Sequence, residues 1–278
     1  MDEQFLRTQI NHFLSEDIGA GDLTSEAIFS PSQRGKALFI AKDNFIAAGL
    51  EKIAPAVFHC QHHAITCMGV VDGTSVKSGD VILTAEGPVL DLLKAERVAL
   101  NLAQRLCGIA TLTTEFVEMV KGLPVSVVDT RKTTPGLRAL EKYAVKVGGG
   151  RNHRLGLSDG ILIKDNHIAA CGSITEAVRL VRDQVPHTLK VEVETENLAQ
   201  VKECLECQVE IIMLDNMSLN MMLQAVKLIN GKALVEASGG ITLANIRRIA
   251  KTGVDLISVG ALTHSAPARD ISMRLVPG

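Results

Sequence analysis

From residue 125 onward, short apolar runs alternate with stretches of helical periodicity. The apolar runs are rich in β-branched residues and occupy 125–128, 161–163, 189–193, 209–214, 232–235 and 256–259. Between most of them, apolar residues recur at helical spacing, in 174–182, 198–205, 219–229 and 243–251. Strands that alternate with helices form parallel βα units. The pattern therefore predicts a β/α barrel or a doubly wound sheet in this part of the chain.

The first 107 residues have a different pattern, in which short β-like runs are separated by Gly-rich turns. The runs include 35–40 and 64–70, and HCQHHAITC (59–67) is interpreted as alternating strand residues next to a turn. A long helical pattern follows at 91–111, with Lys94, Arg97, Asn101 and Arg105 on its polar side. The simplest interpretation of that side is a solvated surface. Together the two patterns favour a large and a small domain.

Polar and charged residues follow the apolar runs closely. A doubly wound dinucleotide fold would place a Gly-x-Gly-x-x-Gly turn after its first strand, but Gly148, Gly149 and Gly150 follow a helical stretch instead. In a barrel the carboxyl ends of the strands converge on one mouth, where barrel enzymes have their active sites. The residues at these ends are Asp129, Arg131, Lys164, Asp165, Glu194, Asp215, Ser238 and Gly260. Their clustering favours the barrel.

The overall charge argues against nucleic acid and membrane surfaces as binding partners. The formal net charge of -2 gives no general attraction to nucleic acid or to an anionic membrane surface. No basic and apolar leader opens the sequence, and no apolar run approaches the about 18 residues of a membrane span. We therefore expect a soluble, cytoplasmic protein.

The six cysteines are scattered over a long chain, which predicts free thiols. Cys204-x-x-Cys207 and the His-rich segment 59–67 could hold a structural metal, but core packing and surface histidines explain them better.

Two glycine-containing loops close the last two predicted strands. ASGGI (237–241) and SVGAL (258–262) let backbone N–H groups approach an anion, and barrels commonly bind phosphate after their final strands. The first loop is expected to open a helix that Thr242 caps. A phosphate monoester is the predicted ligand, and the alternative is that both loops are only tight turns.

Cations and carboxylates are expected at the same mouth. The cations lie in three loops, and arginine forks and lysine point charges both suit carboxylate or phosphate, so a multiply anionic substrate is predicted. They are Arg131, Lys132, Arg138, Arg151, His153, Arg154 and Lys164. Glu194 and Asp215 could hold Mg²⁺, bind sugar hydroxyls or stabilise positive charge on a sugar carbon. The alternative for the acids is a buried ion pair with Lys164.

The segment 129–168, DTRKTTPGLRALEKYAVKVGGGRNHRLGLSDGILIKDNHI, resembles the signature region of the quinolinate phosphoribosyltransferase family. Further similar segments follow the family order over nearly the whole chain: EDIGAGDLTS (16–25), AERVALNLAQRLCGIAT (95–111), VEVET (191–195), MLDN (213–216), EASGGI (236–241) and SVGALTHS (258–265).

The resemblance implies an α/β protein with an N-terminal α/β sandwich domain, residues 1–107 joined by the tail 267–278, and an incomplete β/α barrel, residues 108–266. It implies synthesis of nicotinate mononucleotide, pyrophosphate and CO₂ from quinolinate and phosphoribosyl pyrophosphate, with Mg²⁺ and no organic cofactor. It also implies a homodimer whose sites are shared between subunits, with further assembly left open. Arg97 would then enter the neighbouring subunit's site, which replaces the interpretation of its helix face as a solvated surface.

The resemblance also assigns roles to residues. Quinolinate would be bound by Thr130, Arg131, Lys132, His153, Arg154, Lys164 and Arg97 of the partner subunit. Lys132 should point to the face opposite Arg131. The catalytic set would be Lys132, Lys164, Glu194 and Asp215, the last two also serving Mg²⁺. The 5-phosphate would be bound by Ser238, Gly239, Gly240, Ser258, Val259 and Gly260.

Two alternative functions remain at this point. A related molybdenum-locus protein shares the fold and parts of these motifs. The chain could also be a catalytically silent barrel that binds a phosphometabolite. Retention of both acids and of the cations speaks against the silent binder, and saturable quinolinate binding would separate a quinolinate phosphoribosyltransferase from the molybdenum-locus relative.

Overall fold

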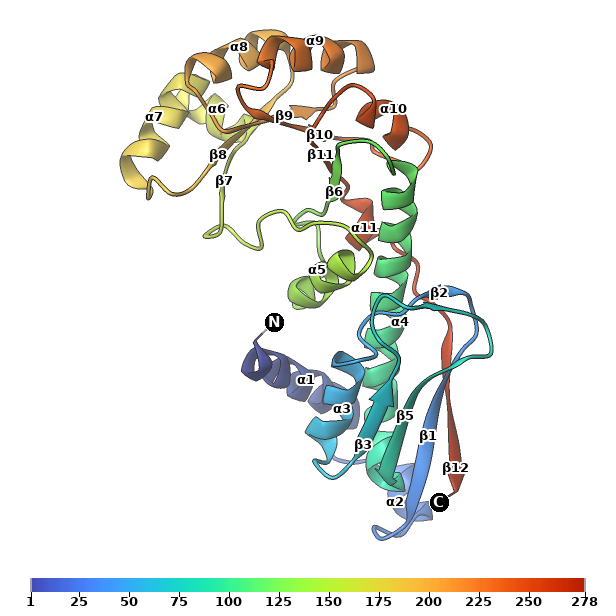
Figure 1. Cartoon of the computed structure of the whole chain (residues 1–278). Coiled ribbons are helices and arrows are strands. Elements are labelled where there is room, and N and C mark those ends of the chain that lie inside the picture. Colours follow the sequence, from blue (N-terminus) through green and yellow to red (C-terminus); the bar gives the residue numbers. More distant parts are fainter. Residues whose placement is uncertain (1, 278) are drawn as a thin grey trace. The chain divides into compact units, whose positions relative to one another are not determined.

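The computed structural model describes residues 2–277 (Figure 1). These residues form two compact units. Within the described range, the first unit comprises residues 2–114, 134–149 and 265–277, and the second comprises 115–133 and 150–264. The segment 134–149 thus belongs with the N-terminal unit, although in sequence it lies beyond residue 107.

The first unit contains an antiparallel sheet in the order β12-β1-β5-β3. Its strands are β1 (Arg34–Ala41), β3 (Thr66–Gly69), β5 (Val81–Pro88) and β12 (Ile271–Pro277), and β2 (Phe45–Ile46) pairs separately with β4 (Ser75–Val76). Residues of β1 are buried alternately, as expected for a sheet with one face on a core. That core includes an edge-on contact between Phe39 and Phe58, whose ring centroids are 5.9 Å apart.

The helices of this unit are α1 (Glu3–Ile18), α2 (Leu23–Ile28), α3 (Ile53–Gln61), most of α4 (Val89–Met119), and α5 (Arg138–Val147). The strand interpretation of 59–67 is wrong for its first part, because 59–61 form the last turn of α3. Gly148, just after α5, has a packing role: a Cβ there would lie 2.4 Å from the Ala110 carbonyl oxygen. Glycine is therefore required where α5 approaches α4.

The second unit contains a parallel sheet in the order β6-β11-β10-β9-β8-β7. The strands are β6 (Ser126–Val128), β7 (Ile161–Ile163), β8 (Val191–Thr195), β9 (Ile211–Asp215), β10 (Leu234–Ser238) and β11 (Leu256–Ser258). Each of the six predicted apolar runs overlaps one of these strands, although β8, β9 and β10 end one to three residues beyond their runs. In the described part of the chain β6 and β7 do not pair with each other, and a parallel bridge joins Val128 to Arg151 beside β6. The predicted incomplete barrel is confirmed.

Helices α7 (Ile174–Gln184), α8 (Leu198–Glu206) and α9 (Leu219–Ile229) lie along the outer side of this sheet (Figure 1). Helix α9 has the predicted bounds because Ser218 caps it, accepting a hydrogen bond from Met221 N–H, and Asn230 ends it in a left-handed conformation. The remaining helices are α6 (Asp165–Cys171), α10 (Ile246–Ala250) and α11 (Ala261–His264). Helix α10 is shorter than the predicted 243–251.

Within residues 2–277, no helix combines the length and the apolar character that a membrane span requires. All six cysteines lie in this range and are free thiols, as expected.

Candidate active site

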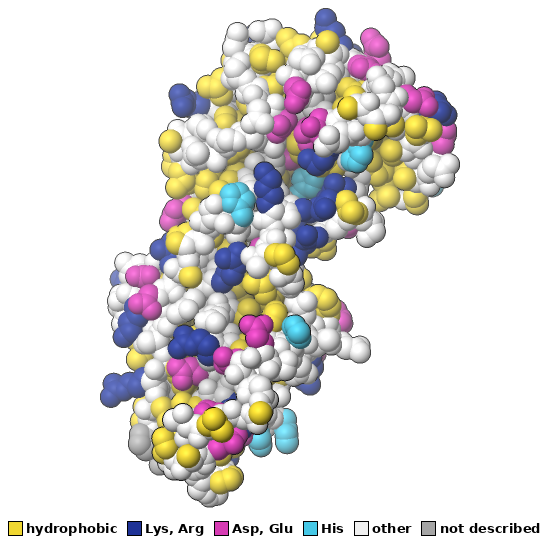
Figure 2. All heavy atoms as spheres, turned by 180° about the vertical axis from the view of Figure 1, so that it is seen from behind, with side chains coloured by type: hydrophobic (Ala, Val, Ile, Leu, Met, Phe, Trp, Pro, Cys, Tyr) yellow, Lys and Arg dark blue, Asp and Glu magenta, His cyan; other side chains and the backbone are white. Residues whose placement is uncertain are grey.

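A cavity of about 580 Å³ opens at the carboxyl ends of the parallel strands. Its lining belongs entirely to the second unit. The residues are Thr130, Arg131, Lys132, His153, Arg154, Leu162, Lys164, Glu194, Met213, Asp215, Asn216, Glu236, Ser238, Gly239, Gly240 and Ser258. Figure 2 shows basic, acidic and His side chains close together in the part of the molecule that the parallel sheet forms. Carboxyl ends are where parallel βα folds place their sites.

Asp129 holds the segment after Gly150 against the end of β6. Its side chain is fully buried, accepting a hydrogen bond from His153 N–H at 2.9 Å and one from the Asn152 amide at 2.6 Å. Arg151 N–H donates to the Val127 carbonyl, which continues the sheet pattern. Asp129 therefore positions the segment that carries His153 and Arg154 and does not line the cavity itself.

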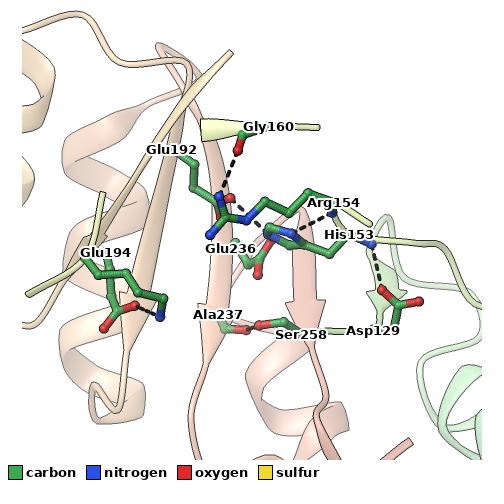
Figure 3. Close-up of polar contacts among 10 residues, drawn as sticks. Asp129, His153, Arg154, Gly160, Glu192, Glu194, Glu236, Ala237 and Ser258 are labelled. Carbon is green, nitrogen blue, oxygen red and sulfur yellow. Dashed lines mark hydrogen bonds and ion pairs between the residues drawn. The ribbon is translucent and has the colours of Figure 1, made fainter. Parts of the chain in front are cut away.

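The cations of the cavity include two neighbouring arginines. Arg154 donates from Nη1 to the Gly160 carbonyl at 2.8 Å (Figure 3). Burial, and then the charge of Arg131, lower the pKa of Arg154. The Arg131 Nε is buried without a hydrogen-bond partner in the described residues. An anion between these guanidinium groups would relieve their repulsion and satisfy the buried donor.

Lys164 and Glu194 form an ion pair at one side of the cavity. The Lys164 Nζ lies 2.7 Å from Glu194 Oε2, and the Glu194 side chain is only 12% exposed. Lys164 is the residue before α6, and Glu194 lies near the end of β8. The ion pair considered as an alternative in the sequence is therefore present, but both partners also face the cavity.

Asp215 ends β9 beside Asn216, whose amide donates to Asp215 Oδ2 at 2.7 Å. Glu194 and Asp215 face the same cavity, so their carboxylates could serve together. Mg²⁺ typically binds one or two protein carboxylates and completes its shell with water and substrate phosphates. The donor set of Glu194 and Asp215 fits such a partial site.

The loop after β10 has a strained backbone that favours glycine. Gly239 and Gly240 have φ of 92° and 61°, and a Cβ on Gly239 would lie 2.1 Å from the Asn216 Oδ1. The predicted helix directly after this loop is not present. Asn245 is the N-cap residue of α10, and Thr242 N–H donates to the Asn245 side chain. The Asn245 amide in turn donates to the Gly240 carbonyl, which fixes the loop.

The loop after β11 contributes less than predicted. Ser258 lines the cavity, but Val259 is buried and its N–H donates to the Val128 carbonyl, so that donor is already used. Gly260 packs beside Lys132, because a Cβ there would lie 3.1 Å from Lys132 Cδ. Lys132 and Arg131 both line the cavity: β6 has ended at Val128, so strand alternation no longer separates them.

Most of the predicted site residues thus meet in one cavity. Arg97 lies in α4 of the first unit, and its side chain is 56% exposed. Of the other predicted cations, Arg138 begins α5 in the first unit, and Arg151 lines a different cavity.

Two polar residues of the lining were missed by the sequence reasoning. Asn216 follows the predicted strand directly. Glu236 interrupts the apolar run LVEAS, and an acidic residue inside a buried strand could have been recognised as a signal.

Glu236 sits in an acidic environment. Burial, and then the neighbouring Glu192 carboxylate, raise the pKa of Glu236 from 4.5 to about 7, whereas His153 and a hydrogen bond from Ser258 oppose the shift. Glu236 is therefore partly protonated near neutral pH. Figure 3 shows Glu192, Glu236 and His153 pointing toward one another.

Comparison with known proteins places these features in a family. The N-terminal domain model of quinolinate phosphoribosyl transferase matches residues 22–107, and the C-terminal domain model matches 109–274. A relative from Synechocystis, called a probable nicotinate-nucleotide pyrophosphorylase [carboxylating], is 47% identical over 96% of this chain and 91% of its own length. A protein of the same name from Bacillus subtilis is also 47% identical, over 96% of this chain and 92% of its own. The crystal structure of NadC from Streptococcus pyogenes superposes with a TM-score of 0.95 at 42% identity, covering 100% of this chain and 99% of that one.

Proposed function

The chain belongs to the quinolinate phosphoribosyltransferase family, and we propose that its reaction takes place in the cavity at the carboxyl ends of β6 to β11. The enzyme is a decarboxylating phosphoribosyltransferase of NAD biosynthesis. It makes nicotinate mononucleotide, pyrophosphate and CO₂ from quinolinate and phosphoribosyl pyrophosphate. The observation that carries the assignment of the site is that one cavity combines a cationic wall, two carboxylates and a glycine loop.

The cationic wall suits quinolinate, which carries two carboxylates. Arg131 and Arg154 repel each other in a partly buried setting, and a dicarboxylate supplies the two negative charges that offset this repulsion. His153 and Lys164 lie on the same lining, and Thr130 is beside them. Nicotinate has a single carboxylate and would leave part of this positive charge unpaired. The wall therefore selects the dicarboxylate.

The acidic side suits the ribose. Glu194 and Asp215 would accept hydrogen bonds from ribose hydroxyls and stabilise the positive charge that develops on C1 as pyrophosphate leaves. Fixed charges of this kind act strongly where water is excluded. Mg²⁺, held by these carboxylates together with pyrophosphate oxygens, would neutralise charge on the leaving group. Lys132, on the same lining, would contact substrate or pyrophosphate oxygens.

The glycine loop suits the 5-phosphate. Gly239 and Gly240 open the backbone so that N–H groups can approach an anion, and Ser238 and Ser258 add hydroxyl donors. After transfer, the ring nitrogen of the nucleotide is cationic and can accept the electrons that the leaving carboxylate gives up. Loss of CO₂ therefore needs no organic cofactor in this proposal.

The quaternary structure is also a proposal. The side chain of Arg97 is exposed and could extend into a neighbouring subunit. In a homodimer, Arg97 of the partner subunit would then contact the quinolinate carboxylates. The cytoplasmic location expected from the sequence stays a prediction. Neither alternative function, the molybdenum-locus relative or the silent binder, is favoured by an observation on this cavity.

The test is an assay of the purified protein with phosphoribosyl pyrophosphate, Mg²⁺ and either quinolinate or nicotinate. We expect pyrophosphate, CO₂ and nicotinate mononucleotide from quinolinate. Nicotinate should give at least about tenfold less product, because it lacks the second carboxylate that pairs with the cations. A lost ion pair of about 1.4 kcal/mol corresponds to a factor of ten. Omission of Mg²⁺ with a chelator should lower the rate. No product from either acceptor, with folding confirmed by circular dichroism, would contradict the assignment.

A further inference from the structure

Three ionisable side chains meet in the interior of the parallel sheet, beside the substrate cavity. Glu236 of β10 is 1% exposed and Glu192 of β8 is 4% exposed. The Nε2 atom of His153 lies 2.9 Å from Glu192 Oε2 and 3.8 Å from Glu236 Oε2. In the described part of the chain, the Oε1 atoms of both glutamates are buried without a hydrogen-bond partner. Two buried carboxyl groups with unused oxygens are costly and call for a chemical reason.

The cluster lies between two cavities. Glu236 and His153 line the substrate cavity. Both also line a second cavity of about 620 Å³, together with Glu192 and with Ile211 and Leu234, which begin β9 and β10. Glu192 lines the second cavity but not the substrate cavity. Glu236 therefore faces substrate on one side and an opening at the amino ends of the strands on the other.

The hydrogen bonds of His153 fix where its proton is. The backbone N–H of Arg154 donates to His153 Nδ1 at 2.8 Å, so Nδ1 carries a lone pair and the ring proton is on Nε2 (Figure 3). That Nε2–H points at Glu192 Oε2, 2.9 Å away, and donates to it. The ligand atoms of the three side chains lie within 4.8 Å of one another, as in a metal site, but the Nε2 lone pair that a metal needs is occupied by this proton.

Within this cluster, Glu236 is the side chain whose pKa is raised, so it is the one that can carry a carboxylic acid proton near neutral pH. The groups that face it are Glu192 from β8, His153 from the segment after Gly150, Asp129 after β6 and Ser258 from β11. Burial and the two carboxylates favour the protonated form, whereas His153 and Ser258 favour the ionised form. A buried neutral carboxylic acid in contact with a substrate cavity is poised to act as a general acid.

The reaction needs such an acid. As the C2–carboxylate bond of the pyridinium ring breaks, its electron pair becomes available on C2, and a proton delivered to C2 while the bond breaks prevents the CO₂ from adding back. We propose that Glu236 is a catalytic residue that donates the proton which C2 receives in place of the lost carboxylate; this inference rests on the proposed function. The new C2–H bond completes nicotinate mononucleotide, and Glu236 becomes a carboxylate. A proton from water in the second cavity then restores the acid without passing through the substrate cavity.

The test separates the two chemical steps in Glu236→Gln, a nearly isosteric change that removes the acidic proton. Pyrophosphate release reports phosphoribosyl transfer, and CO₂ release reports decarboxylation. We expect pyrophosphate release close to the wild-type rate and CO₂ release about 100-fold slower, with the nucleotide that still carries both carboxylates accumulating. Equal rates for pyrophosphate and CO₂ in this variant would overturn the proposal.

An isotope measurement detects the donor directly. In an equal mixture of H₂O and D₂O, the ratio of hydrogen to deuterium at C2 of the product depends on the group that gives the proton. We expect Glu236→Gln to change this ratio. Glu192→Gln, measured at a pH low enough to keep Glu236 protonated, should leave the ratio as in the wild type, because Glu192 does not line the substrate cavity. An unchanged ratio in Glu236→Gln would overturn the proposal, because a merely structural role does not alter the donor.

The pH profile of the wild type gives a test that needs no variant to fold. Single-turnover CO₂ release should be flat at low pH and fall as pH rises through the pKa of Glu236, about 7. In Glu192→Gln the fall should move to lower pH, because the carboxylate that raises this pKa has been removed. A wild-type profile without this fall would overturn the inference. No pyrophosphate from the wild type with quinolinate would instead overturn the proposed function, and this inference with it.

Discussion

At the scale of single residues, a side chain that does not line the cavity can still fix the position of residues that do. Asp129 illustrates this, because its buried carboxylate accepts hydrogen bonds from His153 N–H and from the Asn152 amide and so aligns the segment that carries the cationic wall. The sequence placed Asp129 among the chemical residues because it follows a strand. Its contacts instead give Asp129 a positioning role, because both of its carboxylate oxygens already accept hydrogen bonds from the neighbouring segment.

The loop after β10 allows a matched pair of substitutions. Both Gly239 and Gly240 have positive φ, which costs an alanine about 1–2 kcal/mol. Only at Gly239 would the new Cβ also collide, at 2.1 Å, with the Asn216 side chain, whereas at Gly240 no heavy atom lies within 4 Å. We expect Gly239→Ala to raise the KM for phosphoribosyl pyrophosphate about tenfold more than Gly240→Ala, a difference of about 1.4 kcal/mol in binding. Steady-state kinetics measures this, and equal KM values would show that the collision is relieved without moving the phosphate site.

At the scale of helices, a buried ion pair joins α4 to the segment around α5 within the first unit. The Arg105 Nε donates to Glu141 Oε1 at 2.7 Å, and its Nη2 donates to Thr134 Oγ1 at 2.9 Å. Glu141 is fully buried, and its second oxygen accepts a hydrogen bond from Thr134 N–H. Removing the cation would leave a carboxylate in a setting where water cannot solvate it.

Arg105→Ala should therefore lower the free energy of unfolding by about 3–5 kcal/mol. Arg179→Ala is the control, because Arg179 pairs with Glu176 and Asp183 on the exposed side of α7 and should cost about 0.2–1 kcal/mol. Adding Glu141→Gln to Arg105→Ala should recover part of the loss, since the unpaired charge is then gone. Urea unfolding measures all three. A loss for Arg105→Ala no larger than that for Arg179→Ala would contradict the burial argument.

The sequence predicted the elements of the second unit well for a physical reason. Strands of a parallel sheet that is covered by helices are apolar on both faces, so β9 and β11 appear as continuous apolar runs. Helix α9 also has clear start and stop residues in Ser218 and Asn230. Prediction failed at 59–61, where the end of an apolar helix and the following turn resemble an alternating strand. It also failed at Thr242, because α10 begins only after Asn245, whose side chain accepts a hydrogen bond from Thr242 N–H in the preceding loop.

The candidate site was predictable as a set of residues but not as a set of contacts. Arg131, Lys164, Glu194 and Asp215 could be identified from their positions at strand ends. The carboxyl ends of neighbouring parallel strands lie at the same edge of the sheet, whatever the conformation of the loops that follow. Val259 was assigned to the phosphate by its place in SVGAL, yet its N–H is used by the Val128 carbonyl of a strand distant in sequence. Glu236 was missed for the same reason: its neighbours Glu192 and His153 come from other elements, and no local pattern shows that they meet.

At the scale of the whole molecule, charge is separated locally although the net charge is only -2. The substrate cavity collects cations on one side and carboxylates on another, so anion binding does not depend on a general positive field. Substrate binding should therefore depend on salt less than it would in a strongly basic protein. The same cavity holds no residue of the first unit among the described residues. In the proposed homodimer, that unit would act on a neighbouring subunit through Arg97.

The sharing of sites between subunits can be tested with two inactive variants. Arg97→Ala removes the residue that is proposed to act across the dimer, and Lys132→Ala removes one from the cavity of its own subunit. Each should be nearly inactive and folded, because neither side chain is buried in a core. In a mixed dimer, one site would receive both substitutions and the other would be intact. Random exchange at equal amounts makes about half of all dimers mixed, so activity should recover to about one quarter of the wild type. Native mass spectrometry would establish that subunits have exchanged. No recovery after proven exchange would mean that Arg97 serves its own subunit or no site, because only a residue acting across the interface can be complemented in this way.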